Sequence, residues 1–178
     1  MTLRTSSTRR SCRLSLFCWL GFSAIALAQP GQAIYTDALV NGWQNWGWAT
    51  LNFNNVAPVH SGSASISISA AAWQAIYLHH DAFASSAYTN LAFWIHGGPG
   101  GGQRLQVQAM LSGTAQLPVQ LAPLPANAWQ QITLSLDSLS VANKPNLDVV
   151  NVRLGGLVSV LERAFLLGLS PEHFIVAV

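Results

Sequence analysis

The fold class of this chain is decided by an unbroken alternation of small polar and apolar residues, Ser63-Ala64-Ser65-Ile66-Ser67-Ile68-Ser69. Successive side chains of a β-strand point to opposite faces, so this period of two places Ile66 and Ile68 on the same face. The stretch predicts a strand with one buried side and one solvated side.

Four more stretches share this period, and they cover residues 73–80, 91–96, 104–111 and 130–136. Segments rich in turn-forming residues separate them, at 60–63, 84–86, 97–102, 123–125 and 143–146. Short strands at this spacing indicate an all-β chain, and we expect an antiparallel β-sandwich of the jelly-roll type.

The first 28 residues have the features of a secretory signal peptide. Four arginines precede an apolar run at 14–27, and Ala26-Leu27-Ala28 is a small-x-small cleavage pattern. We therefore expect three parts: a signal peptide at 1–28, a β-sandwich domain at 29–148 and a divergent tail at 149–178. The mature protein is predicted to be secreted, periplasmic or on the cell surface, with no stable membrane span.

Removal of residues 1–28 changes the charge and the cysteine count. Four of the eight basic residues leave with the signal, so four remain against six acidic residues, a formal charge of 4 − 6 = −2. This charge argues against nucleic acid as a partner. Cys12 and Cys18 also lie in the leader, so no disulfide is available to the domain.

Alternation assigns the side chains of residues 73–80 to the two faces of their strand. Ile76 and Leu78 share one parity and are expected in the core. The outer face of the same strand then carries Trp73, Tyr77 and His79.

The same reasoning applies to residues 91–96 and 104–111. The side chains expected in the core are Leu91, Phe93, Ile95, Leu105, Val107, Ala109 and Leu111. Those expected on the outer face are Trp94, His96, Arg104, Gln106 and Gln108.

If these three strands lie in one sheet, its outer face gathers three aromatic rings with histidine, arginine and glutamine side chains. Large exposed apolar patches on soluble proteins mark binding sites. The C–H face of a sugar ring packs on an indole or phenol ring, and its hydroxyl groups bond planar donors and acceptors. We expect a polysaccharide or glycan to bind through Trp73, Tyr77, His79, Trp94, His96, Arg104 and Gln106.

A structural role is the alternative for each of these residues. Trp73 and Trp94 are also explained by burial beneath a loop, and the polar residues by an ordinary solvated strand face. The three tryptophans at 43–48 are expected to plug one end of the sandwich, because tryptophan is highly buried on average. Trp129 is expected to pack at a sheet edge.

Five segments together resemble a secreted galactose-binding-like jelly-roll module, namely 34–37, 42–48, 58–63, 91–98 and 129–136. The likeness covers residues 34–148 and rests on the order and spacing of these segments. The resemblance implies noncatalytic carbohydrate binding, with Trp73, Tyr77 and Trp94 as stacking platforms. It implies no particular sugar.

Residues 149–178 depart from that resemblance, because such modules end in a strand of aromatic and aspartate character. Leu157, Leu161, Phe165 and Leu169 recur every four residues, which favours a short amphipathic helix. The hypothesis is that this tail is divergent or frameshifted and that the sandwich lacks its native final strand.

No cofactor is predicted, and the metal question stays open. A structural calcium ion with Asp37 as one oxygen ligand is one alternative, and a metal bound by His79, His80 and His96 is another.

Catalysis is not expected, because a glycosidase needs two carboxyl groups that flank one bond. The acids of the mature chain are instead scattered along it, at Asp37, Asp81, Asp137, Asp148, Glu162 and Glu172. A cell-surface or matrix module that binds another protein is the leading alternative function, and a degenerate polysaccharide hydrolase is a weaker one.

Overall fold

A computed structural model describes residues 31–154 and the backbone of 172–177, and these residues form antiparallel β-structure with one short 3-10 helix. The all-β prediction is confirmed. The strands are β1 (Gln44–Asn45), β2 (Thr50–Asn55), β3 (Ser65–Ala70), β4 (Ala75–Phe83), β5 (Asn90–His96), β6 (Leu105–Leu111), β7 (Thr114–Ala115), β8 (Val119–Gln120), β9 (Trp129–Ser135), β10 (Leu147–Leu154) and β11 (Glu172–Ala177), and the 3-10 helix is η1 (Ser85–Ala87).

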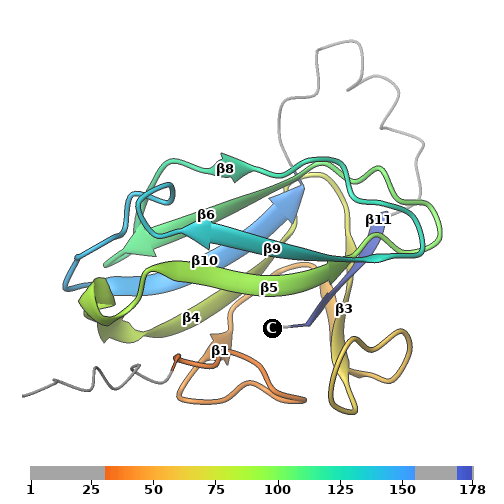
Figure 1. Ribbon diagram of the computed structural model, residues 1–178, viewed down its shortest axis with the longest axis horizontal. Helices are drawn as coiled ribbons and strands as arrows, with labels where there is room; N and C mark the ends of the chain where they lie inside the picture. The colour runs from red at the N-terminus through yellow and green to blue at the C-terminus, as the bar shows by residue number, and fades with distance from the viewer. Residues whose placement is uncertain (1–30, 155–171, 178) are drawn as a thin grey trace, which may run out of the picture.

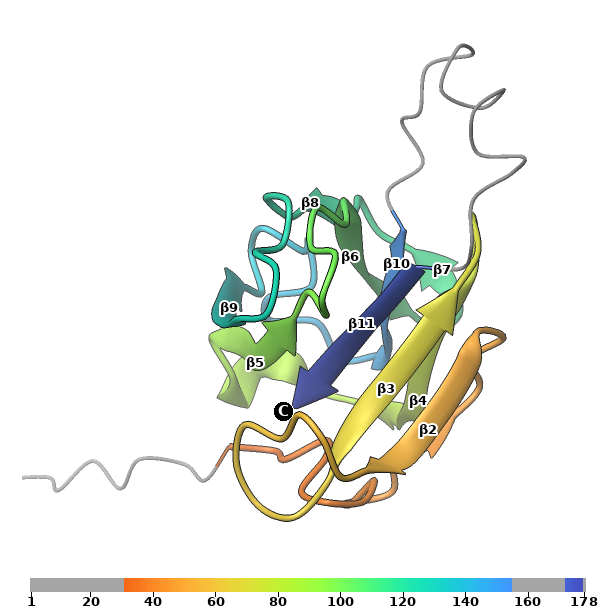
Figure 2. The same cartoon turned by 90° about the vertical axis from the view of Figure 1, so that its right-hand side faces the viewer.

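The strands form two sheets that pack face to face (Figures 1 and 2). The first sheet has the order β1-β4-β10-β6-β7, and β8 also pairs with β6. The second sheet has the order β2-β3-β11-β5-β9. Figure 2 shows β2, β3 and β11 of the second sheet in front of β4 and β10 of the first. The domain is therefore an antiparallel β-sandwich, as the spacing of its strands predicts.

The core lies between the sheets and follows the period-two pattern of the sequence. Ile66 and Ile68 of β3 have no exposed surface, and Ile76 and Leu78 of β4 are 2% and 6% exposed. The residues predicted to face inward in β5 and β6 likewise belong to the core or pack against it. Each strand thus buries the apolar side that its alternation predicts.

The three strands that carry the predicted binding residues do not share one sheet, and that part of the prediction is wrong. β4 and β6 lie in the first sheet on either side of β10, whereas β5 lies in the second sheet. The period of two determines which side of a strand is buried, but contacts between distant parts of the chain determine which sheet the strand joins. The outer sides of β4 and β5 therefore face away from each other.

The C-terminal part of the chain contributes to both sheets, which differs from the predicted boundary at residue 148. β10 crosses that boundary and lies in the middle of the first sheet, paired with β4 and β6. The backbone of β11 pairs with β3 and β5 in the second sheet, so a final strand is present in the sandwich. The helix expected around 157–169 and the signal peptide expected at 1–28 lie outside the described residues.

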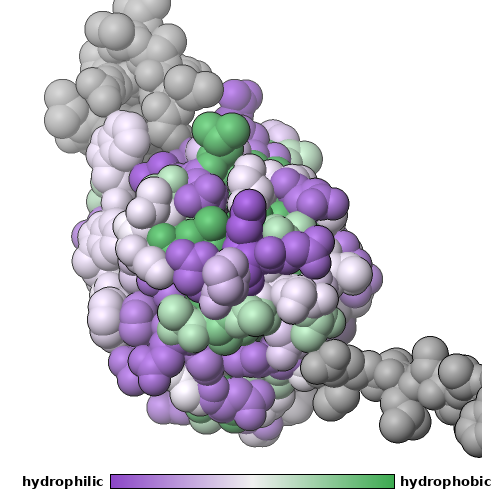
Figure 3. All heavy atoms as spheres, turned by 90° about the vertical axis from the view of Figure 1, so that its left-hand side faces the viewer, coloured by the Kyte–Doolittle hydropathy of each residue, from purple (hydrophilic) through white to green (hydrophobic). Residues whose placement is uncertain are grey.

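The end of the sandwich that points left in Figure 1 carries mainly hydrophilic residues, with small hydrophobic patches between them (Figure 3). Five large hydrophobic residues are exposed within the described chain, namely Trp46, Trp48, Val56, Trp73 and Leu117. Three of them, Trp46, Trp48 and Trp73, lie along one edge of the first sheet. The outer face of that sheet is therefore the candidate binding surface.

Candidate functional site

Trp46 and Trp48 continue the path of β1 along the edge of β4. The backbone N–H of Trp46 donates to Tyr77 O at 2.8 Å, and that of Trp48 donates to Ala75 O at 3.2 Å. Residues two apart in an extended segment point to the same side, so both indoles lie over the outer face of the first sheet. Trp46 is 55% exposed and Trp48 is 53% exposed. The sequence thus places two solvent-facing indoles next to each other.

The indole of Trp46 is held in place from one side. It stacks on the imidazole of His79 with the ring centres 3.6 Å apart and the planes 3° from parallel. Its Nε1 donates to Gln44 Oε1 at 3.1 Å. His79 covers one face of the indole, and the exposed surface of Trp46 is available to a ligand.

Trp48 is fixed by different contacts. Its Nε1 donates to the carbonyl oxygen of Trp73 at 3.0 Å, and its ring lies 5.8 Å from the ring of Tyr77 at an angle of 46°. Trp73 has a positive φ of 71° and is itself 50% exposed. A backbone group therefore sets the orientation of the second indole, and Trp73 adds a third exposed ring nearby.

Gly47 allows the two tryptophans to approach β4 this closely. A Cβ atom built at Gly47 would lie 2.9 Å from Ala75 O and 2.9 Å from Leu51 Cδ1. Real Cβ atoms do not make contacts this short, so any larger residue pushes the segment away from β4. The side chain of Asn45 accepts a hydrogen bond from the N–H of Gly47 at 2.9 Å, which further fixes the segment.

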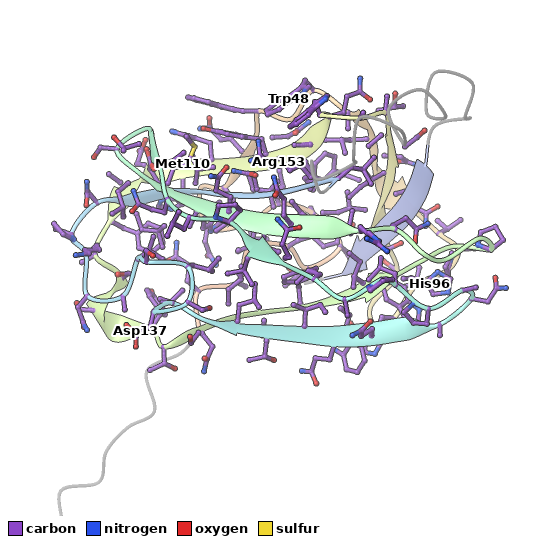
Figure 4. The ribbon with its side chains drawn as sticks, turned by 90° about the horizontal axis from the view of Figure 1, so that it is seen from above. Trp48, His96, Met110, Asp137 and Arg153 are labelled. Atoms are coloured by element: carbon purple, nitrogen blue, oxygen red, sulfur yellow. The ribbon has the colours of Figure 1, made fainter. Side chains whose placement is uncertain are left out.

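Three rows of side chains cross the first sheet beside these indoles. The backbone register aligns His79 with Val149 and Met110, Tyr77 with Asn151 and Gln108, and Ala75 with Arg153 and Gln106. The core residues Val150 and Val152 alternate with the β10 members, so these rows lie on the outer side. We call this surface the Trp48 face; its members are Trp46, Trp48, Tyr77, His79, Gln106, Gln108, Met110, Gln120, Val149, Asn151 and Arg153. Figure 4 shows three of them, Trp48, Met110 and Arg153, on the same side of the sandwich.

Tyr77 occupies the centre of the Trp48 face. Its hydroxyl donates to Met110 Sδ at 2.9 Å. Burial, and secondarily the charge of Asp148, raises the pKa of Tyr77 above its ordinary value of 10.0. The phenol is therefore neutral at physiological pH and presents a ring with a polar edge.

One end of the Trp48 face is a connected group of polar side chains. Gln106 is 4% exposed and lies between Gln120 and Arg153. Its carboxamide is 2.7 Å from that of Gln120 and 2.7 Å from Nη2 of Arg153, and Nε of Arg153 is also in contact with it. This group lies in the same row as Trp48.

At the other end of the face, two buried polar atoms have no hydrogen-bond partner among the described residues. They are Nδ1 of His79 and Oδ1 of Asp148. The second carboxylate oxygen of Asp148 accepts a hydrogen bond from the N–H of Gly113 at 2.8 Å. Hydrogen-bonding capacity is thus left over beneath the Trp46 end of the face.

The structure brings together only part of the predicted binding set. Tyr77, His79 and Gln106 lie on the Trp48 face, and Trp73 borders it through its carbonyl contact with Trp48. Arg104 is exposed and lies one residue before β6. Tyr77, His79 and Gln106 share a face because β4 and β6 belong to the same sheet, which parity alone does not predict.

Trp94 and His96 lie on the opposite outer surface, on β5 of the second sheet. His60 stacks on Trp94 with the ring centres 3.9 Å apart, so a loop covers this tryptophan. His96 is 8% exposed, and its Nδ1 accepts a hydrogen bond from the N–H of Gly98 at 3.0 Å. Figure 4 shows His96 on the other side of the sandwich from Trp48. The prediction of one shelf formed by Trp73, Tyr77 and Trp94 is therefore wrong.

The exposure of Trp46 and Trp48 is not predicted from the sequence pattern. That pattern predicts that all three tryptophans at 43–48 plug an end of the sandwich, which fits Trp43 alone, since Trp43 is 6% exposed. The usable signal was the order Trp46-Gly47-Trp48, with a residue that lacks a side chain between two indoles of equal parity. Trp129 of the edge strand β9 is half-buried, in keeping with the expected edge packing.

The described residues contain no group of three or more His, Cys, Asp or Glu side chains arranged to hold a metal ion. His79 and His96 lie on different sheets, so the proposed histidine site is wrong. Oδ1 of Asp37, the suggested calcium ligand, accepts hydrogen bonds from the N–H groups of Ser63 and Ala64 at 2.8 and 2.9 Å. These bonds lower the pKa of Asp37 below 3.8, so this carboxylate fixes the loop before β3.

A search of the described segments for a membrane-spanning helix found none that is long and apolar enough.

No family model matches this chain. Its sequence is 30% identical over 121 residues to an endoglucanase of Dictyostelium discoideum, and the match covers 63% of this chain. The chain spans only 17% of the length of that relative.

The fold is similar to those of several solved carbohydrate-binding modules. A CBM29-2 variant in complex with mannohexaose is 16% identical, with a TM-score of 0.48 over 80% of this chain and 84% of the other. A CBM22-2 xylan-binding domain from Paenibacillus barcinonensis is 10% identical, with a TM-score of 0.48 over 79% and 90%. A family 11 module from Clostridium thermocellum, in complex with a mixed-linked tetrasaccharide, is 12% identical, with a TM-score of 0.47 over 77% and 86%.

Proposed function

We propose that the Trp48 face binds a polysaccharide noncovalently. The observation that carries this proposal is the pair of immobilised, half-exposed indoles, Trp46 and Trp48, beside a floor of carboxamide and guanidinium groups. A sugar ring has an apolar C–H face that packs on an indole and hydroxyl groups that bond amides. The Trp48 face offers a counterpart to both surfaces of such a ring.

The expected affinity follows from the number of stacked rings. Each sugar ring on an indole contributes about 1–2 kcal/mol, on the scale of aromatic contacts and apolar burial. Two or three rings together with the hydrogen bonds of the floor correspond to dissociation constants on the order of micromolar to millimolar. Because His79 and the carbonyl of Trp73 already hold the indoles, little side-chain entropy is lost when the ligand binds.

The proposed role is noncatalytic. Asp148 lies close enough to the Trp48 face for its charge to act on Tyr77, whereas a glycosidase needs two carboxyl groups that flank one bond. The similarity to a segment of an endoglucanase is in keeping with a glycan ligand, but it concerns a small part of that protein. With the signal peptide expected at 1–28, we place the module outside the cytoplasm, where polysaccharide is present.

A binding screen with matched tryptophan variants tests the proposal. The protein is incubated with insoluble polysaccharides of different backbones, and retention is compared for the wild type, Trp46→Ala, Trp48→Ala and Trp94→Ala. Trp94 serves as the control because it stacks on a histidine as Trp46 does, but on the opposite sheet.

We expect at least one polysaccharide to retain the wild type and Trp94→Ala, and retention to fall by about tenfold or more for the other two variants, a loss of roughly 1.4 kcal/mol. Circular dichroism confirms that each variant is folded. Equal loss in all three variants, or retention on no polysaccharide, would overturn the proposal and favour a protein partner instead.

A further inference from the structure

Arg153, Gln106 and Gln120 lie at the end of the row that contains Trp48. The donor and acceptor in each of their hydrogen bonds follow from the fact that arginine has no acceptor. A guanidinium group can only donate, so the carboxamide oxygen of Gln106 is the atom that accepts from Arg153. The amide nitrogen of Gln106 then faces Gln120. Two NH2 groups cannot bond each other, so the carboxamide of Gln120, whose Nε2 lies 2.7 Å from that of Gln106, is turned as well, with its oxygen toward Gln106 and its NH2 group pointing away from it.

This end of the face therefore offers donors to a ligand. Gln106 is 4% exposed and uses both ends of its carboxamide inside the group. Arg153 has five N–H groups, and the contacts of Nη2 and Nε with Gln106 use two of them, which leaves three without a partner among the side chains of residues 31–154. The free NH2 of Gln120 adds two more donors. A ligand group that binds here must supply acceptors.

The charge of the same end is positive. Arg153 makes no ion pair within the part of the chain whose side chains are described, and the exposed Arg104 lies one residue before β6 at this end. Asp148, whose charge acts on Tyr77, is five residues from Arg153 along β10, which is roughly 17 Å in an extended strand. An anion bound at Arg153 is therefore far from the carboxylate of Asp148.

The backbone register sets the distance between this group and the aromatic platform. Trp48 pairs with Ala75, and Ala75 pairs with Arg153, so the two functional side chains are two strand spacings apart, roughly 10 Å. Ala75, which lies between them, has a small side chain and no exposed surface. Figure 4 shows Trp48 and Arg153 on neighbouring parts of the same surface.

From these observations we infer that the Trp48 face recognises an acidic polysaccharide, in which a sugar unit near the one stacked on Trp48 carries a carboxylate that binds Arg153 and Gln120. A carboxylate has only acceptors, and its two oxygens match the fork of a guanidinium. This inference rests on the proposed function, because it names the ligand class of the same face.

The test uses pairs of soluble glycans that share a backbone and differ in the acid group. One pair is C6-oxidised cellulose and short soluble cello-oligosaccharides, which have the same unsubstituted backbone without the acid; the other is polygalacturonate and its carboxyl-reduced form. Affinities are measured by titration calorimetry at low and at high ionic strength for the wild type, Arg153→Gln, Arg153→Lys and Lys144→Gln. Lys144 is the control, since it is exposed in the turn before β10.

We expect the acidic member of at least one pair to bind roughly tenfold tighter than its neutral partner, as charge-assisted hydrogen bonds imply. Arg153→Gln should abolish this preference, Arg153→Lys should keep part of it, and Lys144→Gln should leave it unchanged. The preference should weaken but persist at high ionic strength, because the fork is a short-range contact.

Two results separate the possible failures. If neutral polysaccharides bind as tightly as acidic ones and Trp48→Ala still abolishes binding, the acidic-ligand inference is wrong and the proposed function stands. If neither pair nor any polysaccharide of the screen binds, both are wrong. A preference that Lys144→Gln removes as fully as Arg153→Gln would show attraction by net charge alone, which also overturns the inference. The wild-type comparison decides the matter even if an Arg153 variant fails to fold.

Discussion

The indole of Trp46 and the imidazole of His79 lie parallel, with their centres 3.6 Å apart and an angle of 3° between the planes. Trp46 follows β1 and His79 lies on β4, so the imidazole supports the indole from a neighbouring strand. Such a contact restricts the indole before any ligand arrives, and preorganisation of this kind raises affinity without adding a contact to the ligand.

His79→Ala should therefore weaken polysaccharide binding although His79 lies behind the indole. We expect a loss of about threefold to tenfold, since a stacked aromatic pair is worth roughly 0.5–1.5 kcal/mol. The matched control is His60→Ala, which removes the ring stacked on Trp94 on the opposite sheet. Equal affinity of wild type and His79→Ala in titration calorimetry would contradict the supporting role of His79.

Gly47→Ala should displace both indoles at once. The added Cβ meets Ala75 O and Leu51 Cδ1 at 2.9 Å, so the segment must move away from β4. We expect destabilisation of about 1–3 kcal/mol, the scale of overpacking, together with a loss of affinity. Gly100→Ala is the control because nothing lies within 4 Å of the Cβ that it adds. Chemical denaturation and glycan retention measured on both variants check this prediction, which fails if they behave alike.

Asp37 should make the stability of the domain dependent on pH in the acid range. Hydrogen bonds from the N–H groups of Ala64 and Ser63 lower the pKa of Asp37 in the folded state below its ordinary value of 3.8. A lowered pKa means that the carboxylate stabilises the fold above pH 3.8, and that this contribution is lost as the pH falls through the folded-state pKa.

The variant Asp37→Asn isolates that effect, since asparagine also tolerates the positive φ of 67° at this position. We expect its melting temperature to lie below that of the wild type at neutral pH and the gap to close in strong acid. Asp137→Asn in the turn after β9 is the control and should show no such convergence. A gap between wild type and Asp37→Asn that is constant with pH would rule out the charge as its cause.

Alternation in β3 should be visible in stability measurements. Ile68 has no exposed surface, so Ile68→Ala is expected to cost about 2–5 kcal/mol through lost burial and the cavity left behind. Ser67, its neighbour on the opposite side of the strand, should tolerate alanine with a change within about 0.5 kcal/mol. Urea unfolding of the two variants measures this difference directly, and similar losses would contradict the assignment of faces.

The inward and outward sides of β3, β4, β5 and β6 could be predicted because a strand has a period of two and each of these strands has one apolar side. Their distribution between the sheets could not, because the pairing of β4 with β10 joins residues about seventy positions apart in the sequence. The alternation of residues within one strand does not indicate which distant strand will pair with it. Tyr77 and Gln106 were therefore placed correctly relative to the core, whereas Trp94 was assigned to the wrong surface.

The two best platform residues were missed for a related reason. Average burial of tryptophan predicts packing for each residue at 43–48, and it does hold for Trp43. Trp46 and Trp48 are exposed because Gly47 lets their backbone bond to β4, so that their side chains extend over the sheet. That outcome depends on a partner strand some thirty residues further along the chain.

The Trp48 face is assembled from both ends of the domain, since its indoles precede β2 and its arginine lies on β10. β10 is the strand that holds β4 and β6 together, and it is made after both of them. A chain that ends before β10 contains every aromatic ring of the Trp48 face. It lacks the strand that joins β4 to β6, so the first sheet cannot form in its complete order. Under the proposed function, a chain truncated before β10 should therefore lack polysaccharide binding even though it contains Trp46 and Trp48.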